Sequence, residues 1–148
     1  MSDEVNEIEQ SGSVEESGTT NSRFNIVTTD RVRAKITRAI AETGTIPVIS
    51  YLAFGDGGLD QSGQPISPDP TANALNHELF RLPIEDVEYL TPYNADLTVS
   101  LASAAYNDTP ITEFGAVDED GDFVGFQTFK TVTKQDILNL LFHWYVEF

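Results

Sequence analysis

The chain has 148 residues, of which 40% are hydrophobic and 10% aromatic, so it can bury the core of one domain. It contains no cysteine, which excludes disulfide bonds, thiol catalysis and zinc sites built from cysteine. Its 24 acidic residues against 8 basic ones give a formal net charge of −16, which would repel a phosphate backbone, so nucleic-acid binding is not expected.

The first segment, residues 1–22, predicts a disordered acidic leader. It is rich in Ser, Gly, Glu and Thr, contains no Lys or Arg, and has few apolar side chains to offset the entropy lost on ordering. The alternative is a segment that orders against a neighbouring subunit. The first residues lack the basic and apolar regions of a signal peptide. Residues 23–148 are expected to form a single domain.

An amphipathic helix is predicted from about residue 29 to residue 43. The stretch Thr28–Asp30 offers an N-cap and Gly44 supplies a stop. Between them, apolar residues recur at helical spacing at Val32, Ile36, Ala39 and Ile40.

Three basic side chains of this helix share one face. Arg31, Lys35 and Arg38 are spaced four and three residues apart, which concentrates positive charge in an otherwise acidic chain. The face is therefore a candidate for docking on an acidic partner. The alternative is a solvated helix side that is balanced by local carboxylates such as Glu42.

A strand predicted at residues 46–54 leads into a glycine-rich loop that contains Gly55, Gly57 and Gly58. A phosphate-binding loop would need a Lys followed by Ser or Thr, and neither is present. The glycines instead predict a tight loop that needs positive φ or a close approach of backbone.

A second short helix is predicted from Thr71 to Leu79. Asp69 is a suitable N-cap, Pro70 suits the first helical position, and Leu75 lies on the same helical face as Leu79.

The second half of the chain is rich in strands. They are predicted near residues 82–90, 95–103, 111–118 and 122–131, and the last two form a hairpin through Glu119–Gly121. The predicted fold class is α+β, with the amphipathic N-terminal helix and the second short helix packed on a mostly antiparallel β-sheet or small β-sandwich.

The end of the chain predicts a strand with one apolar face, formed by Leu138, Leu140, Phe142, Trp144, Val146 and Phe148. This face is a candidate for an interface with another subunit, and the alternative is ordinary core. The segment is far shorter than the roughly 20 residues of a membrane helix, so no membrane partner is expected.

Metal and catalytic sites are not predicted. Asp118, Asp120 and Asp122 have the alternate spacing of a calcium loop, but the glycine precedes the third acidic residue and the closing glutamate is missing, so an acidic turn is expected. His77 and His143 have no second histidine or cysteine at metal-ligand spacing. Since no nucleophile stands beside a base, we predict no catalytic residue, no cofactor and no enzymatic activity.

A polar network is predicted around the glycine loop. Glu78 and Arg81 are three residues apart, within reach of each other or of Asp56. Glu113 stands in a predicted strand, and if buried it must find hydrogen-bond donors.

These segments together resemble the N-terminal domain of the phage tail-collar fibre family, from about Thr28 to Phe148. The resemblance rests on the order and spacing of the opening helix, Ala53–Gly58, Pro70–Thr71 with Leu75, Glu78 and Arg81, and the hairpin Ile111–Val124. It implies a non-enzymatic domain, usually a homotrimer, that attaches a fibre to the tail or baseplate. Family members commonly continue into a fibre shaft, whereas this chain ends at Phe148, so we expect a domain without the distal fibre.

The predicted function is therefore a virion structural protein of a tailed virus, made in the host cytoplasm and located in the tail. It would form an oligomeric tail or baseplate adaptor on which fibre or other tail proteins dock. The alternative is a small receptor- or glycan-binding module at the tail tip, which exposed aromatic residues near Tyr89–Tyr93 would favour. The acid excess indicates a halophilic source and hence a haloarchaeal host, with an ordinary acidic mesophilic protein as the alternative.

Overall fold

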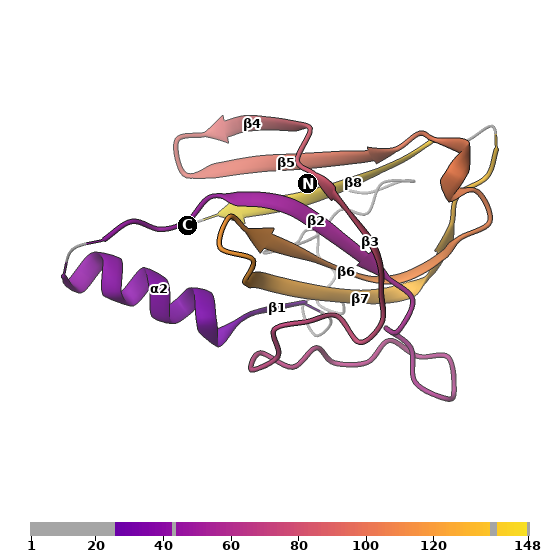
Figure 1. Cartoon of the computed structure of the whole chain (residues 1–148), viewed down its shortest axis with the longest axis horizontal. Helices are drawn as coiled ribbons and strands as arrows, with labels where there is room; N and C mark the ends of the chain where they lie inside the picture. The colour runs from indigo at the N-terminus through magenta and orange to yellow at the C-terminus, as the bar shows by residue number, and fades with distance from the viewer. Residues whose placement is uncertain (1–25, 43, 137–138, 148) are drawn as a thin grey trace.

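The structure, a computed structural model, describes residues 26–42, 44–136 and 139–147. They form a sandwich of two antiparallel β-sheets with one α-helix at its side (Figure 1). Strands account for 53% of the structure and helices for 13%, so the predicted α+β class with two helices on a sheet is wrong. The predicted leader, residues 1–22, lies outside the described residues.

The larger sheet has the order β1-β7-β6-β2-β3 and the smaller sheet has the order β4-β5-β8. The strands are β1 (Ile26–Thr28), β2 (Ile49–Gly55), β3 (Glu78–Pro83), β4 (Asp86–Thr91), β5 (Asn94–Leu101), β6 (Pro110–Asp118), β7 (Phe123–Thr133) and β8 (Leu140–Glu147). The predicted β6–β7 hairpin and the strand near residues 95–103 are confirmed.

The single strand predicted at residues 82–90 is wrong, because the chain changes sheets inside that segment. The Ile84 N–H donates to the Ser50 carbonyl in β2 at 3.0 Å, whereas the next residue, Glu85, donates to the Thr98 carbonyl in β5 at 2.9 Å. Consecutive residues therefore bond to opposite layers of the sandwich. The apolar pattern of the sequence does not reveal such a switch, since β-forming residues occur on both sides of it.

The main core lies between the two sheets and is rich in aromatic rings. The Phe142 ring of β8 lies 4.9 Å from that of Phe54 and 5.5 Å from that of Phe114, and Trp144 lies 5.5 Å from Phe114. Such edge and tilted contacts are favourable beyond the area they bury. The predicted last strand is thus confirmed as β8, and its apolar face packs against the opposite sheet of the same chain.

A second, smaller cluster lies on the other face of the larger sheet. Ala53 belongs to it, whereas its neighbours Leu52 and Phe54 point into the main core, as the alternation of a strand requires. The loop between β2 and β3 covers this cluster with Leu75, which packs with Phe126.

The second predicted helix, Thr71–Leu79, is wrong. One turn at Pro70–Thr71 is followed by bends at residues 73–74 and 76–77, and β3 begins at Glu78. A helix would need its own carbonyls to accept the N–H groups of Asn76 and His77, but both bond to the Glu113 side chain in β6. A long-range acceptor therefore replaces the local helical one.

The first predicted helix is confirmed as α2 (Asp30–Ala41). Thr29 is the N-cap: its hydroxyl accepts from the Val32 N–H at 3.2 Å and donates to the Phe123 carbonyl at 2.6 Å. Val32 is the one buried residue of the helix, and Ile40 near its end is 78% exposed. The helix extends away from the sandwich (Figure 1), and none of the described helices is long and apolar enough to cross a membrane.

Phe142 tests the core role of β8. Replacing this fully buried ring, Phe142→Ala, should lower the free energy of unfolding by about 3–5 kcal/mol, because it leaves a cavity among Phe54, Phe114 and Phe129. Urea denaturation at several protein concentrations measures the loss, which should not depend on concentration. Tyr93→Ala, at a position 70% exposed, is the control and should change stability by about 0.5 kcal/mol or less. A loss seen only on dilution would place Phe142 in a subunit interface instead.

Candidate functional site

Glu113 of β6 organises the glycine loop. Its side chain is buried, with the residue 2% exposed. Oε2 accepts from the backbone N–H groups of Gly57 at 2.9 Å and His77 at 2.8 Å, and Oε1 accepts from the Asn76 N–H at 3.0 Å. Three charge-assisted hydrogen bonds therefore satisfy the buried carboxylate and join both ends of the β2–β3 loop to β6.

The predicted glycine loop packs against these partners more tightly than any side chain would allow. A Cβ added to Gly57 would lie 2.7 Å from the Asn76 Cβ, and one added to Gly58 would lie 2.2 Å from the Thr112 carbonyl oxygen. Gly55 is the last residue of β2, and its added Cβ would meet the His77 carbonyl oxygen at 2.3 Å. Close approach of backbone, and not phosphate binding, explains the glycines.

The predicted polar network separates into three sets of contacts. Glu78 and Arg81 form a bidentate pair at 2.7 and 2.8 Å, and a bulge in β3 at Leu79 puts both on one side of the strand. Asp56 bonds to the exposed His77 ring at 2.5 Å, and not to Arg81. This hydrogen bond raises the pKa of His77. Glu113 bonds to backbone only, as described above.

A lysine binds the acidic β6–β7 turn. The sequence predicted the turn but not this contact. The Lys35 Nζ lies 2.8 Å from Asp118 Oδ2, 3.2 Å from Asp120 Oδ2 and 2.8 Å from Asp122 Oδ2. We call these four residues the lysine clasp. In the part of the chain that the structure describes, no group of three or more His, Cys, Asp or Glu residues could hold a metal ion. The Lys35 ammonium lies where the calcium-like spacing would have suggested a cation.

The electrostatics of the lysine clasp follow from this geometry. Burial opposes the charge of Lys35, but hydrogen bonds with Asp118, Asp122 and Asp120 outweigh it, so the pKa of Lys35 lies above its usual value. The hydrogen bond from Lys35 lowers the pKa of Asp122. The second oxygen of Asp118 accepts the backbone N–H groups of Asp120 and Asp122 at 2.9 and 3.0 Å, which shapes the turn.

The structure places the predicted interface residues in different environments. Leu140, Phe142 and Trp144 are 4%, 0% and 5% exposed, so they lie in the core of one chain and are not available to a second copy. Val146 is partly buried against the same core. Leu138 and Phe148 lie outside the described residues.

The three basic residues predicted to share one face of the helix also lie in different environments. Lys35 is held in the lysine clasp, whereas Arg31 and Arg38 are exposed on α2.

Strand β4 is an unusually exposed part of the sandwich. All six of its residues are exposed, and they include Tyr89 at 75%, Leu90 at 51% and Val87 at 46%. Tyr93, in the turn to β5, is 70% exposed. β4 is at the edge of the smaller sheet, with no further strand beyond it among the described residues.

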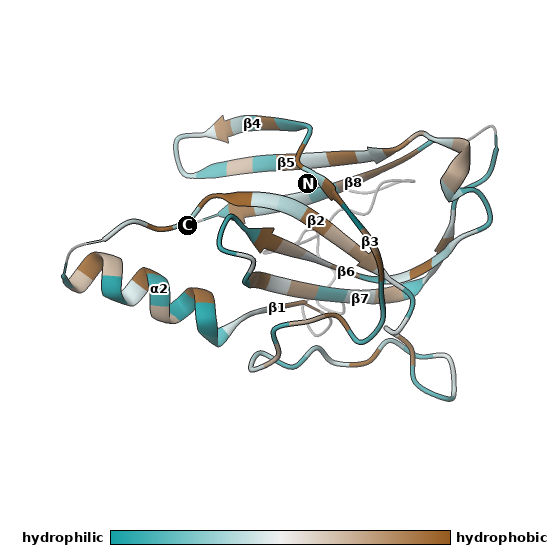
Figure 2. Cartoon of the chain, viewed as in Figure 1, coloured by the Kyte–Doolittle hydropathy of each residue, from teal (hydrophilic) through white to brown (hydrophobic). Residues whose placement is uncertain are grey.

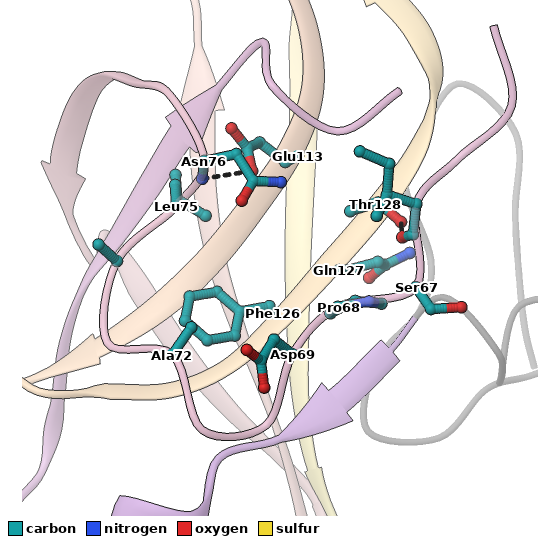
Figure 3. A pocket seen from close by; sticks show the side chains of 12 residues that line it. Ser67, Pro68, Asp69, Ala72, Leu75, Asn76, Glu113, Phe126, Gln127 and Thr128 are labelled. Atoms are coloured by element: carbon teal, nitrogen blue, oxygen red, sulfur yellow. Dashed lines mark hydrogen bonds between the residues drawn. The ribbon is translucent and has the colours of Figure 1, made fainter. Parts of the chain in front are cut away.

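A small cavity of about 140 Å³ lies between the β2–β3 loop and strands β6 and β7 (Figure 3). Leu75 and Phe126 line it, together with Asn76 and Glu113, which are bonded to each other. Typical ligand sites measure about 300–1,000 Å³, so this cavity is too small for most substrates. His77, at the nearby surface, is bonded to Asp56.

No protein-family model matches this chain, and no curated protein and no solved structure matches it. The resemblance to tail-collar domains therefore remains a prediction from the spacing of residues.

The lysine clasp can be tested with Lys35→Met. The substitution leaves three carboxylates facing one another, so we expect a loss of about 2–3 kcal/mol in the free energy of unfolding. The loss should shrink in concentrated NaCl, which screens the repulsion. Urea denaturation at low and high salt measures both effects. Lys130→Met, at an exposed position, is the control, and an equal loss in both variants would contradict the role of the clasp.

Glu113→Gln tests the anchor of the loop. A Gln side chain has one acceptor oxygen for three N–H groups, so we expect the free energy of unfolding to fall by about 2–4 kcal/mol. Amide hydrogen exchange should also become faster at Gly57, Asn76 and His77. Glu147→Gln, at an exposed position in β8, is the matched control. Unchanged exchange at the three amides would show that Glu113 does not hold the loop.

Proposed function

We propose that the chain is a virion structural protein of a tailed virus, which forms an oligomeric tail or baseplate adaptor on which fibre or other tail proteins dock. The observation that carries this proposal is β4, a sheet edge with every residue exposed and with Val87, Tyr89 and Leu90 among them. Large apolar side chains on an open edge are a liability for an isolated protein. They are typical of surfaces that bind another protein.

The groups around the glycine loop also support a scaffold role. Glu113 is satisfied by backbone donors, Glu78 is paired with Arg81, and Asp56 is paired with His77. The bonds of Glu113 hold the loop to β6, and the Asp56–His77 bond joins the two ends of the loop. They involve the same residues on which the resemblance to tail-collar domains rests, and that resemblance supports assembly over catalysis.

A receptor- or glycan-binding module is the second candidate. Tyr89 and Tyr93 are 75% and 70% exposed, which is the feature expected of a recognition surface. The burial of Leu140, Phe142 and Trp144 also removes the apolar face of the last strand as a symmetric interface, which was the feature expected to favour assembly. Assembly through other surfaces is therefore what the adaptor proposal requires.

The molar mass of the purified protein in solution tests the adaptor proposal. We expect an oligomer, with a trimer favoured, in dilute buffer or in about 2 M NaCl, where charge repulsion is screened. Light scattering with size-exclusion chromatography gives the mass over a range of concentrations. A strict monomer at high concentration in both salts would contradict the proposal. Such a monomer that binds glycans and loses binding on Tyr89→Ser and Tyr93→Ser would favour the second candidate.

A further inference from the structure

A buried lysine just after β7 has no ion-pair partner among the described residues. Lys134 is 1% exposed, and its Nζ donates to the Asn107 Oδ1 at 2.6 Å and to the Gln135 carbonyl oxygen at 3.0 Å. Lysine is seldom buried this completely unless a charged partner accompanies it. Lys35, by contrast, keeps 18% of its side chain exposed and binds three aspartates. The burial of Lys134 against neutral oxygens therefore points to a role other than ion pairing.

The amide that Lys134 contacts is itself held by a carboxylate. Asn107 follows the 3-10 helix η1 (Ala104–Tyr106), and its Nδ2 donates to the Asp136 Oδ1 at 3.0 Å. Asn107 and Lys134 also form a β-bridge, and the Asp108 N–H donates to the Lys134 carbonyl oxygen at 2.9 Å. The three side chains therefore run from amine to amide to carboxylate, and the backbone holds the two segments that carry them together.

The contact joins two connections between the sheets. Asn107 lies in the connection from β5 to β6, and Lys134 and Asp136 lie in the connection from β7 to β8. Each connection links the smaller sheet with the larger one, and both lie at the same end of the sandwich (Figure 1). Figure 2 shows hydrophilic positions, in teal, within these connections. A bond between them would tie together the two places where the chain changes sheets.

This arrangement brings a nucleophile to an electrophilic carbon. Asn107 Oδ1 is directly bonded to Cγ, so the Lys134 Nζ, 2.6 Å from Oδ1, lies within about 4 Å of that carbon. Reacting atoms in a productive encounter are about 3–3.5 Å apart, so only a small movement is needed. Removal from water is one way in which proteins activate a lysine as a nucleophile. A carboxylate at the leaving nitrogen can act as general base and general acid.

We propose that Lys134 and Asn107 form an intramolecular isopeptide bond, with Asp136 as the proton carrier. Nζ attacks Cγ as the neutral amine, and the tetrahedral intermediate holds both nitrogens on one carbon. Asp136 takes a proton from Nζ and gives it to Nδ2, the Cγ–Nδ2 bond breaks, and Nδ2 leaves as ammonia. The proton that the lysine first loses to solvent ends on this ammonia. The product is an amide between Nζ and Cγ, and no oxidant, reductant or other co-reactant is consumed.

The bond goes beyond the proposed function, since a single chain suffices to form it. It closes a covalent ring over residues 107–134, which includes β6 and β7. A cross-link of this kind restricts the unfolded chain and thereby stabilises the folded one, as a disulfide does. The chain contains no cysteine, so a disulfide could not supply this restriction.

Mass spectrometry of the intact, folded protein tests the bond. The mass should be lower than that of the sequence by one ammonia. Trypsin should not cleave after Lys134, because its amine has become an amide, and the digest should contain residues 82–130 joined to residues 131–148. Without the bond, trypsin would release residues 131–134 and 135–148 as separate peptides.

Substitutions separate this bond from other losses of ammonia. Lys134→Met lacks the nucleophile and should keep the full mass of its own sequence. Asp136→Asn keeps the size of the side chain but cannot carry the proton, so the reaction should slow by about a hundredfold or more. Lys130→Met, at an exposed position in β7, is the matched control and should lose ammonia as the wild type does.

The wild-type measurement is decisive even if a variant fails to fold. A mass equal to that of the sequence, with normal cleavage after Lys134, would overturn the proposal. Loss of ammonia that persists in a folded Lys134→Met variant would place the reaction elsewhere and overturn it as well. Cross-linking of Asp136→Asn at the wild-type rate would show that Asp136 is not the proton carrier. None of these outcomes depends on oligomeric state, so the adaptor proposal is tested separately.

Discussion

The structure depends above all on the buried carboxylate of Glu113. A charge in this position would be very unfavourable without donors, and three backbone N–H groups from the β2–β3 loop supply them. Because those donors come from both ends of the loop, the same carboxylate closes the loop and sets where β3 begins. The closed loop then carries Leu75 onto the outer face of the larger sheet, where it covers the second apolar cluster.

A similar constraint acts at the other end of the larger sheet, where Lys35 meets three aspartates. The chain has a net charge of −16 and only 8 basic residues. One of these, Lys35, offsets the negative charge of the three aspartates in the β6–β7 turn. It also holds the first half of α2 against the sandwich and leaves the second half extended. The three remaining arginines of the helix stay at the surface, where Arg33 lies 3.5 Å from Asp30. The internal ion pairs thus shape the charge pattern that a partner would meet.

Local patterns predicted several elements correctly, and long-range contacts explain the others. The N-cap and apolar spacing were sufficient for α2, and the Asp-Gly turn between two β-rich segments was sufficient for the β6–β7 hairpin. Thr71–Leu79 has a good helical start, but its later N–H groups bond to Glu113, 36 and 37 residues away. The proximity of Glu78 and Arg81 was predicted from their spacing, although a β-bulge and not a helix brings them together. Lys35 and Asp118 are 83 residues apart, and no local signal joins them.

The sequence by itself determined the acidic surface, the lack of thiol chemistry and the alternation of the last strand. These are properties of composition or of neighbouring residues. Only the tertiary structure decided that Leu140, Phe142 and Trp144 form core, that β3 and β4 belong to different sheets, that Gly55, Gly57 and Gly58 meet backbone of distant residues, and that Lys35 binds three aspartates while Arg31 and Arg38 are exposed. The physical reason is that a sequence specifies which face of an element is apolar or charged, whereas long-range packing decides what covers that face.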